Sequence, residues 1–134
     1  MTSLTTILRM NAASCIGFGS LFVALPGAVA AFLGAPPAPD TVVRLLGGLL
    51  LLNGFHLLYT SGHAQPHRWL VFYFSLGDFL WVLATAGLIG AGLWITTPAG
   101  VAAAVAVAAA VGAMGAAQVA ALRRGTAHRG MTTQ

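Results

Sequence analysis

Four long apolar stretches, separated by short polar links, dominate this sequence. They cover residues 5–25, 41–60, 69–90 and 99–122, and each reaches the roughly 20 residues that a helix needs to cross a bilayer. Charged side chains make up only 6% of the chain, whereas soluble domains carry about 25%. The pattern predicts an all-α integral membrane four-helix bundle, a single domain over residues 1–122. It excludes a large domain outside the membrane.

The segment after the first stretch is too short to cross a membrane. Pro26 ends that stretch, because proline lacks a backbone donor and disfavours helix at the preceding residue. Residues 27–34 are apolar and are followed by a proline-rich run at 35–39, so we expect a short interfacial helix. Arg9, the first stretch and the small residues 28–30 also resemble a signal peptide. Because three further spans follow, we expect the first stretch to be retained as a helix.

The polar links carry signals for helix ends. Asp40 is expected to be the N-cap of the second span. Trp94 follows the third span and fits the headgroup belt of a membrane. The threonines at 96–97 and Pro98 are expected to cap and open the fourth span. The tail over 123–134 is rich in Arg, Gly and Thr, and it is predicted to be cytoplasmic and frayed.

The arginines predict an orientation. Arg44 lies beside Asp40 at one end of the predicted bundle. Positively charged residues favour the cytoplasmic side of a membrane, so both termini are predicted to be cytoplasmic, in a bacterial cytoplasmic (inner) membrane. No basic patch interleaved with aromatics indicates a nucleic-acid partner. The arginines at the opposite end from Arg44 are Arg9, Arg68, Arg123, Arg124 and Arg129.

The fourth span is rich in alanine and glycine, which gain little from contact with lipid. We therefore expect it to pack closely against other helices, because small residues let helix backbones approach. Glycines of the other spans are expected to serve the same purpose, since no strand-turn-helix context suggests phosphate binding. These packing glycines are Gly47, Gly48, Gly54, Gly87, Gly90, Gly100, Gly112 and Gly115.

Polar residues inside the spans are the candidates for function. Asp78 lies about ten residues into the third span, roughly 15 Å deep in a membrane. An aspartate there costs about 2.5–3.5 kcal/mol to insert, so it must face protein or water. Every span brings a polar side chain to the same, cytoplasmic half. The predicted cluster comprises Asp78, His56, Asn53, Asn11, Ser14, Trp81 and Gln118.

Two interpretations of this cluster compete. In the first, the network fixes how the helices pack, and Asp78 accepts hydrogen bonds from Asn11, Asn53, His56 or Ser14. In the second, Asp78 and His56 form a protonatable pair at the base of a cavity open to the cytoplasm. Asp78 could also meet a partner protein.

Other chemistry finds little support in the sequence. The single Cys15 excludes an intramolecular disulfide and is expected to be a small packing residue. His63 and His67 are separated by Pro66, so no metal site is predicted. No second intramembrane histidine accompanies His56 as a haem ligand. We predict no catalytic residues and no cofactor.

Several short motifs stand out along the chain. They are LRMNA at 8–12, LGGLL at 46–50, GDFLWVL at 77–83, TTPAG at 96–100 and a late Gln118. Together they resemble a group of small four-span bacterial membrane proteins of unassigned function. The layout is also loosely similar to the DoxX-like proteins, some of which accompany membrane oxidoreductases. This resemblance implies the four-span topology and no catalytic residues.

These observations predict a structural or accessory subunit of a membrane complex. The expected partners are the lipid bilayer and either further copies of the chain or a larger membrane complex. The alternative is a proton-linked carrier or channel for a small solute, centred on Asp78. A third hypothesis is a membrane enzyme that acts on a lipid or quinone.

Overall fold

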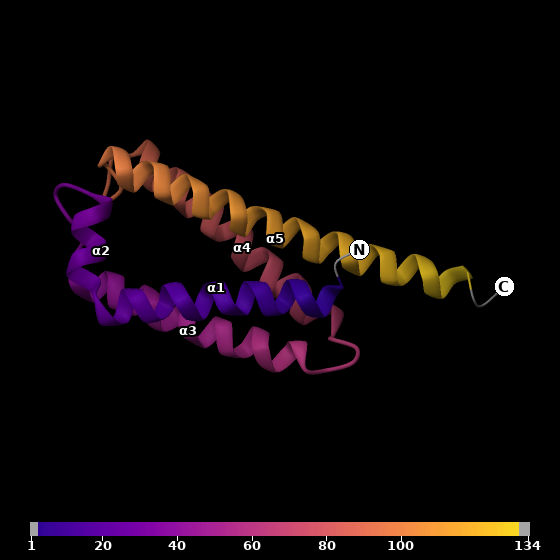
Figure 1. Ribbon diagram of the computed structural model, residues 1–134. Coiled ribbons are helices and arrows are strands. Elements are labelled where there is room, and N and C mark those ends of the chain that lie inside the picture. Colours follow the sequence, from indigo (N-terminus) through magenta and orange to yellow (C-terminus); the bar gives the residue numbers. More distant parts are fainter. Residues whose placement is uncertain (1–2, 132–134) are drawn as a thin grey trace.

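Helices are the regular secondary structure of the described residues, and short non-helical links connect them. This computed structural model describes residues 3–131, except for the side chain of Arg129. Four helices are long and apolar enough to cross a membrane, so the chain is a multi-pass membrane protein. Along the chain the helices are α1 Leu4–Ala24, α2 Pro26–Leu33, α3 Asp40–Ser61, α4 Arg68–Gly90 and α5 Pro98–Met131 (Figure 1).

Local sequence signals explain where several helices begin. The Ser3 side chain accepts a hydrogen bond from the Thr6 backbone N–H at 3.2 Å and caps α1. Pro26 occupies the first turn of α2, where its missing N–H costs nothing. The Thr97 hydroxyl accepts a hydrogen bond from the Gly100 N–H at 3.0 Å, as expected for a threonine cap before Pro98.

Asp40 does not cap α3, contrary to the prediction. The N-cap is Pro39, and no side-chain hydrogen bond caps the helix. Asp40 is instead the first helical residue, because the extended backbone ends at Pro39 (φ −59°, ψ 136°). A carboxylate in the first turn still faces the positive end of the helix dipole.

The last helix extends past the predicted end of the span at residue 122. α5 continues to Met131, so residues 123–131 are helical rather than frayed. The arginines, Ala127 and Met131 of this segment favour helix, and no proline interrupts it. The rest of the predicted tail, residues 132–134, lies outside the described residues.

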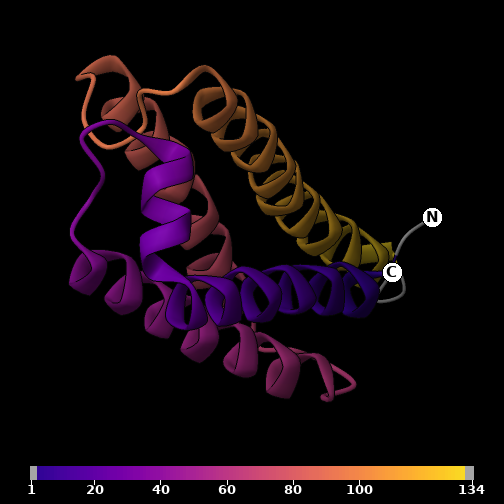
Figure 2. The same cartoon turned by 60° about the vertical axis from the view of Figure 1, so that its left-hand side comes forward.

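The spanning helices form two pairs. α1 packs mainly on α3, and α4 packs mainly on α5. Figure 2 shows that the pairs converge near the N-terminal end of α1 and diverge toward its C-terminal end. There α2 crosses from one pair to the other. It is held at the start of α5 by the Thr96 N–H, which donates to the Leu33 carbonyl at 2.9 Å, and by the Thr97 hydroxyl, which donates to the Phe32 carbonyl at 2.6 Å.

Glycines allow α1 and α3 to approach closely. A Cβ at Gly19 would lie 2.8 Å from the Gly47 carbonyl oxygen, and one at Gly47 would lie 2.9 Å from the Gly19 carbonyl oxygen. A Cβ at Gly54 would lie 2.7 Å from Ile16 Cγ1. The packing role predicted for Gly47 and Gly54 is confirmed, whereas Gly19 was not singled out from the sequence.

Other glycines divide between packed and open positions. A Cβ at Gly112 would lie 3.3 Å from Val82 Cγ2, and one at Gly100 would overlap the backbone of Leu33. At three of the predicted packing glycines, a Cβ would meet no atom of the described chain within 4 Å. These are Gly48, Gly87 and Gly90.

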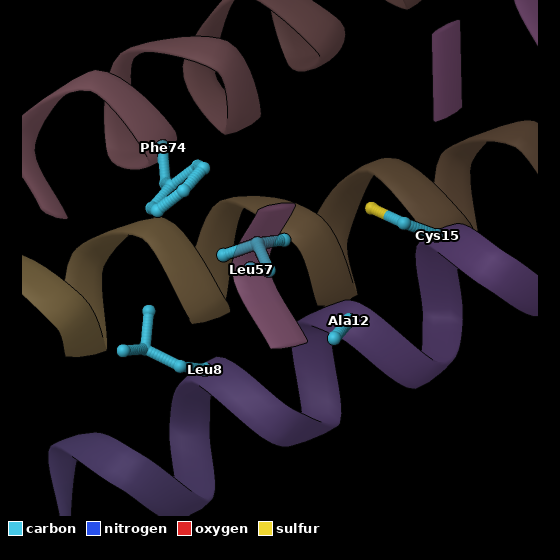
Figure 3. Close-up of a cluster of buried hydrophobic side chains, with 5 residues drawn as sticks. All are labelled: Leu8, Ala12, Cys15, Leu57 and Phe74. Carbon is cyan, nitrogen blue, oxygen red and sulfur yellow. The ribbon is translucent and has the colours of Figure 1, made fainter. Parts of the chain in front are cut away.

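A small apolar cluster joins α1, α3 and α4 next to the polar site. Figure 3 shows its side chains facing one another, with α5 behind them. Large apolar side chains elsewhere point outward; Leu52, for example, is 69% exposed. This distribution fits lipid as the surrounding solvent. The cluster consists of Leu8, Ala12, Cys15, Leu57 and Phe74.

Candidate functional site

The Asp78 carboxylate is buried between three helices. Asp78 lies on α4 and is only 4% exposed. The Asn11 side-chain amide, on α1, donates to Oδ1 at 3.1 Å and to Oδ2 at 2.9 Å. The Gln118 amide, on α5, donates to Oδ2 at 2.8 Å. Both donors are neutral, and both are as deeply buried as the carboxylate, at 1% and 0% exposure.

Weaker contacts connect this site to α3, the remaining spanning helix. The Cys15 thiol donates to Asn11 Oδ1 at 3.6 Å. The Asn53 amide, on α3, donates to Cys15 Sγ at 3.5 Å. Sulfur is a weak donor and acceptor, so these contacts position Asn11 more than they strengthen the site. The five side chains connect all four spanning helices, and we call them the Asp78 network.

Small residues on α5 make the approach to α4 possible. A Cβ at Gly115 would lie 3.1 Å from Asp78 Cβ and 3.4 Å from the Phe79 ring. Gln118 follows three residues later, on the same face of α5. Its long side chain therefore returns onto the Asp78 carboxylate.

Three residues of the predicted cluster lie outside the network. The Ser14 hydroxyl donates to the Met10 carbonyl of its own helix at 3.1 Å. His56 is exposed, and its ring meets Phe74 edge-on with 5.1 Å between ring centroids. Trp81 is half-buried. The second interpretation paired His56 with Asp78, but among the described residues the carboxylate takes its hydrogen bonds from Asn11 and Gln118.

Sequence reasoning missed two side chains at this depth. Cys15 was expected only to pack, yet its thiol links Asn11 to Asn53. Its spacing of four residues from Asn11 on α1 was the available signal. Ser75 is also buried, and its hydroxyl oxygen, like Gln118 Oε1, has no hydrogen-bond partner among the described residues.

The geometry of the network suits a structural role. Amide donors satisfy both carboxylate oxygens of Asp78 from two other helices. A hollow of about 370 Å³ lies nearby between α1 and α5, but neither Asp78 nor its partners line it. Within residues 3–131, no three His, Cys, Asp or Glu side chains lie together as metal ligands.

Comparisons with known proteins find no relative of this chain. No protein-family model, no curated protein and no solved structure matches the chain. The resemblance to DoxX-like proteins therefore stays a prediction.

Proposed function

We propose that this chain is a structural or accessory subunit of a complex in a bacterial cytoplasmic membrane. The burial of Asp78 among donors from α1 and α5 carries this proposal. In a membrane, apolar contacts discriminate poorly between helix arrangements, because lipid tails are as apolar as leucine. A carboxylate that two amides must reach selects one arrangement.

The arginine distribution supports an orientation with both termini in the cytoplasm. Arg9 on α1, Arg68 on α4 and the pair Arg123–Arg124 on α5 all belong to the end of the bundle where α1 begins. Arg44 belongs to the opposite end. Arg129 follows on α5, although its side chain lies outside the described part of the chain. Positive charge favours the cytoplasmic side.

Unoccupied glycine faces support a partner within the membrane. Gly48 on α3 and Gly87 and Gly90 on α4 have open space where a side chain would begin. Helices of a partner or of a second copy can approach such positions closely. In mild detergent we expect a particle larger than one 13.6-kDa chain. Recovery of single chains only, by light scattering corrected for detergent, would contradict the proposal.

The role of Asp78 can be tested with two substitutions of similar size. Asp78→Leu leaves the Asn11 and Gln118 amides buried without an acceptor, and we expect the free energy of unfolding to fall by about 2–4 kcal/mol. Asp78→Asn keeps an acceptor, and its new N–H groups can use the unpartnered Gln118 Oε1. We expect that variant to stay within about 1 kcal/mol of the wild type. Thermal unfolding in detergent measures both.

An apolar carbodiimide distinguishes the subunit from a proton-linked carrier. In an Asp40→Asn background, Asp78 is the sole side-chain carboxylate of the sequence. We expect it to remain unmodified, because its oxygens are buried and hydrogen-bonded. Modification of Asp78 in folded protein, located by peptide mass, would favour the carrier instead.

A further inference from the structure

A lateral groove between α1 and α5 carries an inference that is independent of the Asp78 network. Its volume is about 370 Å³. All but one of its lining side chains are apolar, and the exception is an arginine. The lining residues are Ile7 and Met10 of α1, and Ala113, Met114, Ala117 and Arg124 of α5.

The lining residues are ordered by depth in the membrane. Gln118 bonds to Asp78, which is about 15 Å along α4 from its start at Arg68. Met114 lies one turn deeper than Gln118 along α5. Arg124 lies six residues, about 9 Å, toward the proposed cytoplasmic surface. The apolar part of the groove is thus at hydrocarbon depth, and the guanidinium lies near the headgroup level.

This combination matches the chemistry of an anionic phospholipid. A guanidinium recognises phosphate oxygens through charge-assisted hydrogen bonds, and its five N–H donors allow it to do so without giving up contacts to its own chain. Met10 and Met114 are flexible and polarizable, so they adapt to an acyl chain. Ala113 and Ala117 leave room for it. Basic pockets between spanning helices on the cytoplasmic side are suited to anionic headgroups.

The charge of the chain favours an anionic over a zwitterionic lipid. The formal net charge is +4, and the two acidic side chains lie elsewhere. Asp40 begins α3 at the opposite end of the bundle, and Asp78 is bonded to amides. We propose that the groove binds one anionic phospholipid, with its phosphate at Arg124 and one acyl chain between α1 and α5.

Retention of lipid by the purified protein tests this proposal. The full chain is reconstituted in vesicles of equal phosphatidylglycerol and phosphatidylcholine, extracted in mild detergent and examined by native mass spectrometry. We expect one phosphatidylglycerol per chain to be retained in preference to phosphatidylcholine. Arg124→Gln should reduce this retention about fivefold. The matched control is Arg123→Gln, which changes a neighbouring exposed arginine that does not line the groove.

A second pair of variants tests the acyl-chain part of the groove. Ala117→Leu should fill the groove and reduce retention, whereas Ala116→Leu changes an exposed neighbour outside it. Thermal unfolding checks that each variant is folded. Equal retention of both lipids by the wild type, or equal losses in a variant and its control, would overturn the proposal. Displacement of phosphatidylglycerol by inorganic phosphate would also overturn it, by assigning Arg124 to a free anion.

Discussion

Asp78 receives its strong hydrogen bonds from residues far away in the sequence, Asn11 and Gln118. Leaving a buried polar group without a partner costs more than a satisfied hydrogen bond gains. Each amide therefore matters chiefly because the carboxylate is already buried. Asn11 has the larger role, since its amide donates hydrogen bonds to both carboxylate oxygens and its Oδ1 accepts one from the Cys15 thiol.

Asn11→Leu should be strongly destabilising. It removes the α1 donor and leaves Asp78 with Gln118 alone, so we expect the free energy of unfolding to fall by about 2–3 kcal/mol. Ser14→Ala is the control on the same helix. The Ser14 hydroxyl donates to the Met10 carbonyl of its own helix, and its loss should change stability by less than about 0.5 kcal/mol. Circular dichroism during thermal unfolding in detergent compares them, and equal losses would contradict this account.

At the scale of the helices, glycines set how closely the two helices of each pair approach. α1 and α3 meet at Gly19 and Gly47, where each carbonyl oxygen occupies the space that a Cβ on the other helix would need. α4 and α5 meet at Gly115, beside Asp78. Shape at these crossings sets the rotation of each helix, and the rotation decides which polar side chains face inward.

Adjacent glycines on α3 allow a direct test of this packing. In Gly47→Ala the new Cβ would meet Phe22 Cβ at 2.8 Å and Gly19 O at 2.9 Å, and we expect a loss of about 1–3 kcal/mol. In Gly48→Ala the new Cβ meets nothing of its own chain within 4 Å, so the higher helix propensity of alanine should add up to about 1 kcal/mol to the stability of the single chain in detergent. Midpoints of thermal unfolding report both changes. Similar shifts for the two variants would show that the crossing is looser than described.

At the scale of the whole molecule, the hydropathy of the sequence predicts part of the fold and leaves part of it open. The four spans and the short helix after the first follow from hydropathy, because hydrocarbon forces backbone groups to find partners within the chain. The positions of Asn11, Asn53 and Gln118 near Asp78 follow from the same rule. Helix rotation does not follow from it. Asn53 and His56 are three residues apart on α3, yet only Asn53 reaches the network.

Labelling from each side of the membrane tests the orientation of the whole chain. The wild-type thiol of Cys15 is buried, so it gives a low background with an impermeant maleimide. In intact bacteria we expect Ala91→Cys to react, because this exposed residue follows α4 at the end that the proposed orientation places outside. His63→Cys and Thr126→Cys should react only after the cells are opened. The reverse pattern would invert the proposed topology.

The bridge formed by α2 has a mechanical consequence. It lies between the two helix pairs at the end where they diverge (Figure 2), while the Asp78 network joins the pairs toward the other end. The separation of the two pairs is therefore fixed at both ends, by a helix at one end and by hydrogen-bonded side chains toward the other.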